Sequence, residues 1–217
     1  MAAGSLRPRR NRRNPVQTRE RLLQAAFTEI FRSGYRGTEI DAILATAGVT
    51  KGAMYHHFAN KQALGHAVVD EVILEITNAK WVRPLARAAD PIAALCKVIR
   101  GSSLRPSDIA RGCPLNNLAQ EMSPLDEQFR RRIVKIFAIW QNAVATALRD
   151  AQEKGMLRPG IRIDETAQFV MAAYEGYVSL SKNAQDPQIL KAGSQTLARY
   201  IEALRVRRGR RLVRGIR

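Results

Sequence analysis

The segment GYRGTEIDAILATAGVTKGAMYHHFANKQAL, residues 34–64, decides the fold of this 217-residue chain. Thr38 is expected to begin a helix, because its hydroxyl can cap the free amides and Asp41 completes a capping-box-like pattern. Gly48 suits the left-handed backbone position that commonly ends a helix. The first part of the segment therefore predicts a short helix with defined ends.

A second short helix is predicted after the turn Ala47–Val49, with Thr50 as its cap and its end near His57. Two helices separated by so short a turn have the spacing of a helix-turn-helix, whose second helix enters the DNA major groove. The small residues Gly52 and Ala53 would let the start of that helix approach a duplex closely. A plain helical hairpin with an aromatic core plug is the alternative interpretation of the same periodicity.

Several side chains of this segment are candidates for contact with DNA. Thr50 and Lys51 lie at the start of the second helix, where backbone amides and the helix dipole favour a phosphate. Tyr55 and His56 are expected to face outward, toward phosphate oxygens or base edges, and Lys61 is expected to contact the same phosphate backbone. The full set of candidate DNA-binding residues is Thr38, Thr50, Lys51, Gly52, Ala53, Tyr55, His56 and Lys61.

The rest of the chain also has helical patterns, and no alternating apolar run bounded by hairpin turns indicates a sheet. A fourth helix is expected to begin after Asn60. Later helices are predicted over residues 124–154, from Asp164 onward, and over residues 187–205. Three of the predicted starts place a capping side chain before a proline; they are Asp90-Pro91, Ser123-Pro124 and Asp186-Pro187.

The net charge of +17 is concentrated at the two ends of the chain. Residues 1–15 carry five arginines and residues 205–217 carry seven, and neither segment has an acidic residue. Such ends are expected to be disordered and to bind phosphate backbones without sequence preference. An acidic membrane surface would attract them too, so a basic protein associated with membrane surfaces is an alternative of another class.

Several other classes of protein are not indicated. No apolar run approaches the ~20 residues that span a bilayer, and no signal peptide is recognisable, so we expect a cytoplasmic protein. The cysteines Cys96 and Cys113 are too few for a disulfide framework. Because the adjacent His56 and His57 cannot share a helical face, no metal site is expected. Nothing in the sequence indicates a cofactor, a glycine-rich phosphate loop or a catalytic set, so no enzyme is predicted.

The segment 34–64 resembles the DNA-binding domain of the TetR family of transcriptional regulators. A Gly-Tyr turn, Ala-Gly-Val, Lys-Gly, Tyr-His-His-Phe and Asn-Lys stand in the family's order, and the resemblance extends over residues 16–76. It implies that five of the candidate residues face DNA; these are Thr50, Lys51, Tyr55, His56 and Lys61.

The resemblance also implies the fold and the function. The expected fold is all-α, with an N-terminal three-helix helix-turn-helix domain in residues 16–76 and a larger helical ligand-binding and dimerisation domain in residues 77–205. A basic arm, residues 1–15, and a basic tail, residues 206–217, would flank them. The expected function is that of a repressor which binds a palindromic operator in double-stranded DNA as a homodimer and releases it when a small-molecule effector binds. Activation in place of repression stays open.

The resemblance implies a ligand pocket in the larger domain, and aromatic and amide side chains are the candidates for its lining. Each aromatic one is equally an ordinary core or interface residue. The candidate pocket residues are Trp81, Cys113, Asn117, Trp140, Tyr174 and Tyr177. The last two helices are implied to pack against those of a partner. The candidate dimer residues are Phe169, Val170, Ala173, Tyr177, Leu197, Tyr200, Ile201 and Leu204, and an internal core is the alternative for each.

Cys113 suggests a variant of this function. Arg111 lies two residues before it and a helical segment follows it, and both a cation and a helix N-terminus lower the pKa of a thiol. Some TetR relatives have a similar Gly-Cys segment and sense electrophiles or oxidants there. A repressor that senses such reagents through Cys113 is therefore the alternative to a non-covalent effector, and a small buried apolar residue is the structural alternative.

Overall fold

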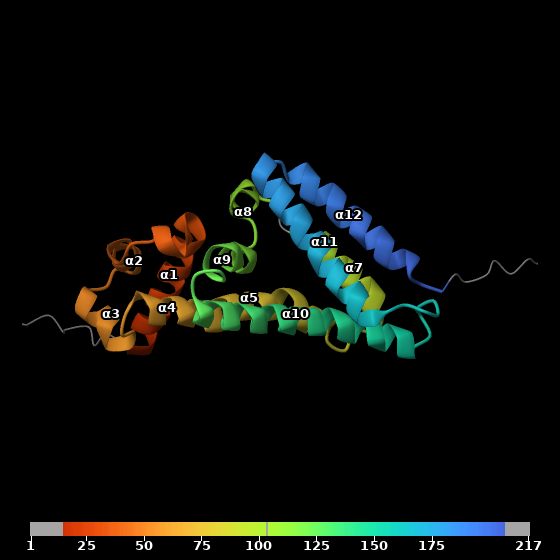
Figure 1. Cartoon of the computed structure of the whole chain (residues 1–217), viewed down its shortest axis with the longest axis horizontal. Coiled ribbons are helices and arrows are strands. Elements are labelled where there is room, and N and C mark those ends of the chain that lie inside the picture. Colours follow the sequence, from red (N-terminus) through yellow and green to blue (C-terminus); the bar gives the residue numbers. More distant parts are fainter. Residues whose placement is uncertain (1–14, 103, 207–217) are drawn as a thin grey trace, which may run out of the picture. The chain divides into compact units, whose positions relative to one another are not determined.

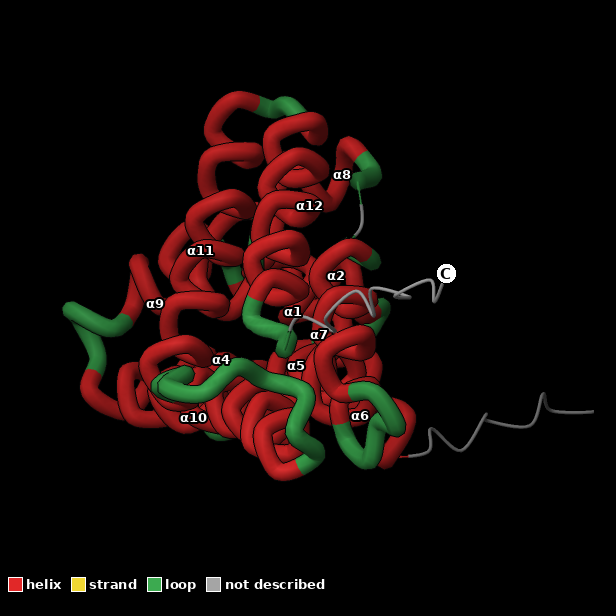
Figure 2. The backbone as a smooth tube through the Cα atoms, turned by 90° about the vertical axis from the view of Figure 1, so that its right-hand side faces the viewer, coloured by secondary structure: helices red, strands yellow, loops and turns green. Residues whose placement is uncertain are grey.

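The computed structural model describes residues 15–102 and 104–206, so most of the predicted basic arm and tail lies outside the described residues. Helices joined by short loops make up the described chain, and Figure 2 shows no strand in it. One isolated antiparallel bridge pairs Leu157 with Arg205. The prediction of an all-α fold is confirmed.

The described residues form two compact units that divide between Val68 and Val69. The helices of the first unit are coloured red to orange in Figure 1. They are α1 (Pro15–Gly37), α2 (Ile40–Ala47), α3 (Lys51–His57) and α4 (Lys61–Ala67). Their inward apolar side chains form a core that excludes water; its fully buried members include Leu22, Ala26, Ile43, Met54 and Leu64.

Three local signals around the helix-turn-helix are confirmed. Thr50 caps α3 by accepting a hydrogen bond from the amide of Ala53 at 3.3 Å, and Asn60 caps α4 by accepting one from Ala63 at 2.8 Å. Gly48 adopts the left-handed conformation, with φ of 61°, that ends α2. These caps satisfy amides and carbonyls that a short helix would otherwise leave unpaired.

The predicted cap at Thr38 is wrong. The N-cap of α2 lies one residue later, at Glu39, and no side chain bonds to the first amides of the helix. The hydroxyl of Thr38 instead donates to the carbonyl of Gly34 at 2.6 Å. This bond spans the bend at Gly34, whose φ of 76° interrupts the helical backbone near the end of α1.

Val69, the first residue of the second unit, lies in a continuous helical run that alternates between π-helical and α-helical turns. Its segments are η1 (Val68–Ile73), α5 (Leu74–Thr77), η2 (Asn78–Val82) and α6 (Arg83–Leu85). The helices that follow are α7 (Pro91–Arg100), α8 (Pro106–Arg111), α9 (Pro114–Met122), α10 (Glu127–Glu153), α11 (Ile163–Ala184) and α12 (Pro187–Ala203). π-Helical turns are rare and frequently occur at functional sites, which draws attention to η2.

The predicted helix starts in the second unit are partly confirmed. Asp90 and Asp186 cap α7 and α12 in front of their prolines. The start predicted at Ser123-Pro124 is wrong, because Asp126 caps α10 by accepting from the amides of Gln128 and Phe129. Asp164 lies in the first turn of α11 but does not cap it, and it pairs with Arg149 at 2.8 Å.

α12 lies beside α11 in both views, and α10 runs along the lower edge of the second unit in Figure 1 (Figures 1 and 2). Their facing sides bury a continuous apolar cluster with α7. Trp81 and Trp140 stack within this cluster, with ring centres 4.6 Å apart. None of the helices in the described part of the chain has the length and apolar character required to cross a bilayer.

Candidate functional site

The outer face of α3 is polar and exposed, while its inner face anchors it to the first unit. Met54 is completely buried and Phe58 nearly so, which fixes the rotation of α3. Tyr55 is 46% exposed although it is a large aromatic residue, and His56 is exposed beside it. The rotation set by the buried pair therefore turns Tyr55 and His56 to solvent.

The start of α3 is open to solvent. Thr50, Lys51 and Gly52 are all exposed, and a Cβ built on Gly52 would meet no atom within 4 Å. The fold of this chain therefore does not itself require glycine at this position. Ala53 is half-buried behind it. The start of α3 therefore presents backbone amides, the positive end of the helix dipole and a lysine on a surface with no large side chain at Gly52. These features favour the approach of a phosphate.

Lys61, in the first turn of α4, is held against the end of α1. Its ammonium lies 4.8 Å from the centre of the Tyr35 ring and donates to the carbonyl of Arg36 at 3.4 Å. Such a cation–π contact stabilises the positive charge without neutralising it. The lysine is thus positioned while some of its donors stay available.

Arg21 fixes the turn between α2 and α3. Its guanidinium donates to the carbonyls of Ala47 and Gly48, the latter at 3.1 Å. A Cβ on Gly48 would lie 2.9 Å from the same guanidinium, so both φ and space favour glycine here. Arg21 consequently holds α1 against the turn that sets the angle of α3.

Thr38 differs from the other candidate DNA-binding residues. Only 2% of it is exposed, and its hydroxyl is bonded to Gly34 as described above. This burial argues against a side-chain contact with DNA. Thr38 contributes instead to the bend between α1 and α2.

The second unit contains a cavity of about 140 Å³ between η2, α8, α9, α10 and α11. Four of the predicted pocket residues lie in its wall, namely Trp81, Cys113, Trp140 and Tyr174. Most of the wall is apolar, as is usual for small-molecule sites. The other apolar members are Ile73, Ile76, Ile109, Pro114, Leu115, Val178 and Leu190.

A polar chain crosses one side of the cavity. The ammonium of Lys80 donates to the hydroxyl of Tyr174, and this hydroxyl also bonds to the hydroxyl of Ser102 at 2.8 Å. Lys80 also lies 4.7 Å from the centre of the Tyr174 ring and 5.5 Å from that of Trp81. The chain joins η2, α11 and the loop after α7 through side chains far apart in the sequence.

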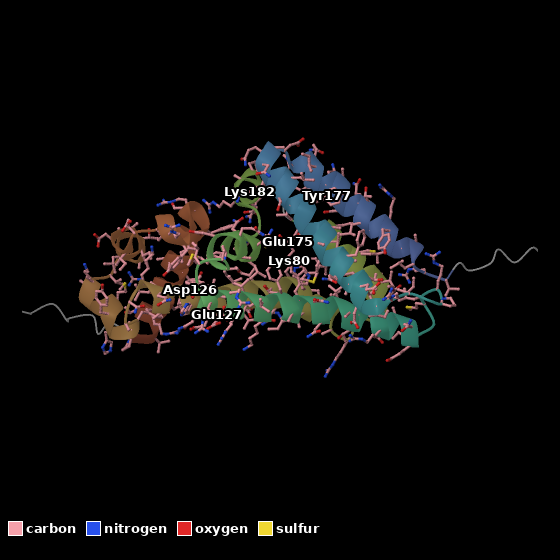
Figure 3. All side chains as sticks on the ribbon, in the orientation of Figure 1. Lys80, Asp126, Glu127, Glu175, Tyr177 and Lys182 are labelled. Atoms are coloured by element: carbon pink, nitrogen blue, oxygen red, sulfur yellow. The ribbon has the colours of Figure 1, made fainter. Side chains whose placement is uncertain are left out.

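Glu175 is a buried carboxyl in the same wall. Within the described part of the chain, neither of its carboxyl oxygens has a hydrogen-bond partner of normal geometry. Burial raises the pKa of Glu175, and this effect outweighs the nearby Cys113 thiol, the Lys80 ammonium and the Asn116 amide, which each lower it. Figure 3 shows Glu175 and Lys80 next to each other beside α11. The carboxyl therefore has unused hydrogen-bonding capacity inside the cavity.

The expected low pKa of Cys113 is wrong. Cys113 does precede α9, as the sequence indicated, but burial, with a smaller contribution from the neighbouring Glu175, raises the pKa of its thiol to about 12. Desolvation of the thiolate outweighs the amide of Asn116 and the charge of Lys80. Burial also raises the pKa of Cys96 to about 12, so neither cysteine is a ready thiolate.

Two predicted pocket residues do not line this cavity. The side chain of Asn117 bonds to the carbonyl of Arg111 at 2.7 Å and to the ammonium of Lys182 at 3.0 Å. Tyr177 lies on α11 and packs against Gly193 of α12, where a Cβ would come within 2.1 Å of the tyrosine ring. Both residues tie helices together at a distance from the cavity wall.

The predicted dimer residues fall into two groups. Those that belong to the chain's own core are Val170, Leu197, Ile201 and Leu204, and they have no apolar surface left for a partner. Phe169 and Tyr200 are 50% and 39% exposed and stack edge to face with ring centres 5.0 Å apart. Ala173 and Tyr177 are half-buried.

No sequence pattern distinguishes Lys80, Ser102, Glu175 or the exposed Leu180. A lone lysine, serine or glutamate on a helix has no pattern that distinguishes an inward position from a solvated one. Leu180 is 56% exposed on α11, and no local sequence pattern predicts that exposure. Within residues 15–102 and 104–206, no three histidine, cysteine or acidic side chains are arranged to hold a metal ion.

Both units match models of known families. Residues 22–68 match the model of bacterial regulatory proteins of the tetR family, and residues 88–197 match that of the tetracyclin repressor-like C-terminal domain. The second match covers half of the chain. Together they include the helix-turn-helix and the cavity-lining helices α8 to α11, while η2 lies between the two matched ranges.

Relatives and solved structures have the same organisation. The HTH-type transcriptional repressor DhaR of Mycobacterium sp. (strain GP1) is 28% identical over 88% of this chain and 93% of its own length. The transcriptional regulator AcuR of Cereibacter sphaeroides is also 28% identical, over 82% of this chain and 83% of its own. The crystal structure of a TetR transcriptional regulator from Chloroflexus aurantiacus J-10-FL is 30% identical, with a TM-score of 0.78 over 88% of this chain and 97% of that one.

Proposed function

Because the chain belongs to the TetR family of bacterial transcriptional regulators, we propose that it is a ligand-responsive repressor that binds a palindromic operator as a homodimer. Its general role is regulation of transcription through DNA, and it is not an enzyme. A small molecule in the cavity of the second unit would release the DNA. DhaR, which is a repressor, supports repression over activation.

The observation that carries the DNA-binding assignment is the surface of α3. Its exposed side bears Lys51, Tyr55 and His56, and its first turn has no bulk at Gly52. A recognition helix with such a start can place its amides and lysine at phosphates and its central side chains at base edges. Lys61 would add a phosphate contact from α4.

A homodimer would read the two halves of a palindrome. Its recognition helices must lie about one turn of DNA apart, roughly 34–36 Å. The exposed apolar side chains of α11 and α12 support a self-complementary surface for this dimer. They are Phe169, Leu180 and Tyr200.

The ligand would act by its differential affinity for two conformations of the dimer. A molecule that binds more tightly to the conformation with the wrong helix spacing lowers the population of the conformation that binds DNA. The size of this shift is limited by the difference between its affinities for the two conformations. The cavity supports this step because apolar walls surround a few convergent polar groups, as in small-molecule sites.

A footprint on DNA upstream of the protein's own gene tests the proposal. The expected result is a protected segment with two-fold symmetry, which disappears with the variant Tyr55→Ala and persists with Tyr200→Ala at saturating protein. Size-exclusion chromatography of the same samples would show a dimer for the wild type and a larger monomer fraction for Tyr200→Ala. A protein that protects no DNA segment, or that binds as a monomer, would contradict the proposal.

A further inference from the structure

We propose that the cavity binds a neutral, flat molecule of about the size of benzene that carries a hydroxyl group, the chemical class of phenol, with the hydroxyl hydrogen-bonded to Glu175. This inference rests on the proposed function, because it names the ligand class of the same cavity. Four observations support it: the size of the cavity, the shape of its walls, the unpaired carboxyl and the balance of charge.

The size of the cavity limits the ligand. Its volume of about 140 Å³ is close to the ~150 Å³ of an engineered apolar cavity that binds benzene. A larger effector would require side chains to move. A single six-membered ring with one small substituent fits without such movement.

The aromatic walls favour a flat apolar body. Trp81 and Trp140 stack at 4.6 Å, and Tyr174 stands edge-on to both, with ring centres 5.1 and 5.9 Å away. Offset and edge-to-face contacts between rings stabilise aromatic pairs beyond the burial of their area. An aromatic ring would extend this cluster into the cavity.

Glu175 requires a polar partner. Both of its carboxyl oxygens are buried, and neither has a hydrogen bond of normal geometry in the part of the chain that the structure describes; an unsatisfied buried group is costly. A hydroxyl can donate to an ionised carboxylate and can accept from a protonated carboxyl. It therefore suits Glu175 in either form, whereas an ammonium cannot accept from the protonated carboxyl and a carboxylate cannot donate to the ionised one.

The charges in the wall disfavour an ionic ligand. Lys80 is already engaged by the hydroxyl of Tyr174 and by the ring of Trp81, so the protein itself supplies partners for its charge. An ammonium ligand would meet the charge of Lys80, and a carboxylate would meet Glu175 and Asp108. Burying an additional unpaired charge among these groups is expensive, so a neutral ligand is favoured.

Isothermal titration of the purified full-length protein with four probes tests this inference. The probes are phenol, toluene, benzoate and benzylammonium, which share a ring and differ in the group offered to Glu175. The expected result is that phenol binds at least about tenfold more tightly than toluene, the gain that one hydrogen bond to a buried polar group provides. Benzoate and benzylammonium are expected to bind more weakly than phenol.

Two variants assign the preference to Glu175. In Glu175→Leu the affinity for phenol should fall to that for toluene, because only apolar contacts remain. Glu175→Gln keeps the shape of the side chain and a hydrogen-bond acceptor, but the acceptor is uncharged and therefore weaker. The preference for phenol over toluene is expected to fall to about threefold in this variant. Glu153→Leu, at the exposed end of α10, is the matched control and should keep the wild-type ratio. If Glu175→Leu does not fold, the ratio of the affinities of Glu175→Gln for phenol and toluene still tests the role of Glu175.

Each alternative result overturns the inference. Equal affinities for phenol and toluene, an unchanged ratio in both Glu175 variants, or no binding of any probe would each do so. Tighter binding of benzoate would indicate an anion site at Lys80, and tighter binding of benzylammonium a cation site at Glu175. The proposed function has a separate readout, because the operator footprint needs no probe; a footprint without a phenol preference would overturn only the ligand class.

Discussion

The ammonium of Lys61 and the ring of Tyr35 lie 4.8 Å apart, and this contact links the first turn of α4 to the end of α1. The lysine of the fourth helix is therefore oriented by the first helix before any DNA is bound. A preoriented cation loses less side-chain entropy on binding a phosphate than a freely rotating one.

Lys61→Ala should weaken binding to every DNA sequence alike. A phosphate contact carries no base information, so site preference should stay, while the slope of log affinity against log salt should decrease in magnitude by about one. Fluorescence anisotropy at several salt concentrations measures both quantities. Lys97→Ala, an exposed lysine on α7, is the control. An unchanged salt slope would mean that Lys61 does not contact phosphate.

Gly52→Ala should separate folding from DNA binding. The added Cβ meets nothing in the protein, and alanine is the better helix former by up to about 1 kcal/mol, so the melting temperature should stay or rise. DNA affinity should nevertheless fall, because the methyl group would stand where the duplex approaches. Thermal melting and anisotropy on the same sample give the two readings. Full DNA affinity would contradict a close approach at Gly52.

Gly193→Ala should destabilise the packing of α11 against α12. Its Cβ would lie 2.1 Å from the ring of Tyr177, and such overpacking typically costs about 1–3 kcal/mol. Gly176→Ala is the matched control, because a Cβ there meets nothing within 4 Å. Urea unfolding should show a lower midpoint for the first variant and an equal or higher one for the second. Equal stability of the Gly193 variant would show that Tyr177 moves aside freely.

Cys113 should react slowly with electrophiles in the folded protein. With its pKa raised from 9.0 to about 12, its thiolate fraction at neutral pH is about a thousandfold lower than that of a free thiol. Mass spectrometry after treatment with N-ethylmaleimide should show little modification in buffer and full modification in urea. Mild electrophiles should also leave DNA bound.

The matching control for this prediction is Cys113→Ser. If an electrophile released DNA from the wild type and not from this variant, Cys113 would be the sensor that the sequence alone suggested. Equal retention of DNA by both proteins is the expected outcome.

Glu175→Gln should change how stability depends on pH. Because the pKa of Glu175 is raised above 4.5 in the folded state, the folded protein holds the proton more tightly than the unfolded chain. The resulting stabilisation is complete below about pH 4.5 and is lost as the pH rises through the folded pKa. The variant lacks this loss, so the melting temperature of the wild type should fall relative to that of the variant as the pH rises from about 4.5 through the folded pKa. A difference between the two proteins that stays constant with pH would show that folding does not raise the pKa of Glu175.

The sequence predicts local features of this fold well, because their causes lie within a few residues. Thr50, Asn60 and Asp186 each stand directly before a helix whose amides they satisfy. The prediction failed at Ser123 because Asp126, only three residues on, is a competing cap that bonds to two amides. A capping pattern indicates that a helix starts nearby, and packing selects the residue.

The candidate site was predictable only where it is continuous in sequence. α3 carries its exposed side chains within one segment, so its motif reveals them. The cavity instead joins Lys80 to Tyr174, which are 94 positions apart. Whether Cys113 is a thiolate or a buried thiol likewise depends on Glu175 and on burial, neither of which the local sequence contains.

The two tryptophans of the chain both line the cavity and stack on each other. The intrinsic emission of the folded protein under selective tryptophan excitation therefore originates at a single location, next to the polar groups of Lys80 and Tyr174. A ligand that enters the cavity would change the emission of both tryptophans at once, and no tryptophan elsewhere in the chain would add an unchanged signal. The tryptophan fluorescence of the unlabelled protein should consequently report whether the cavity is occupied. It is suited to screening mixtures whose active component is unknown.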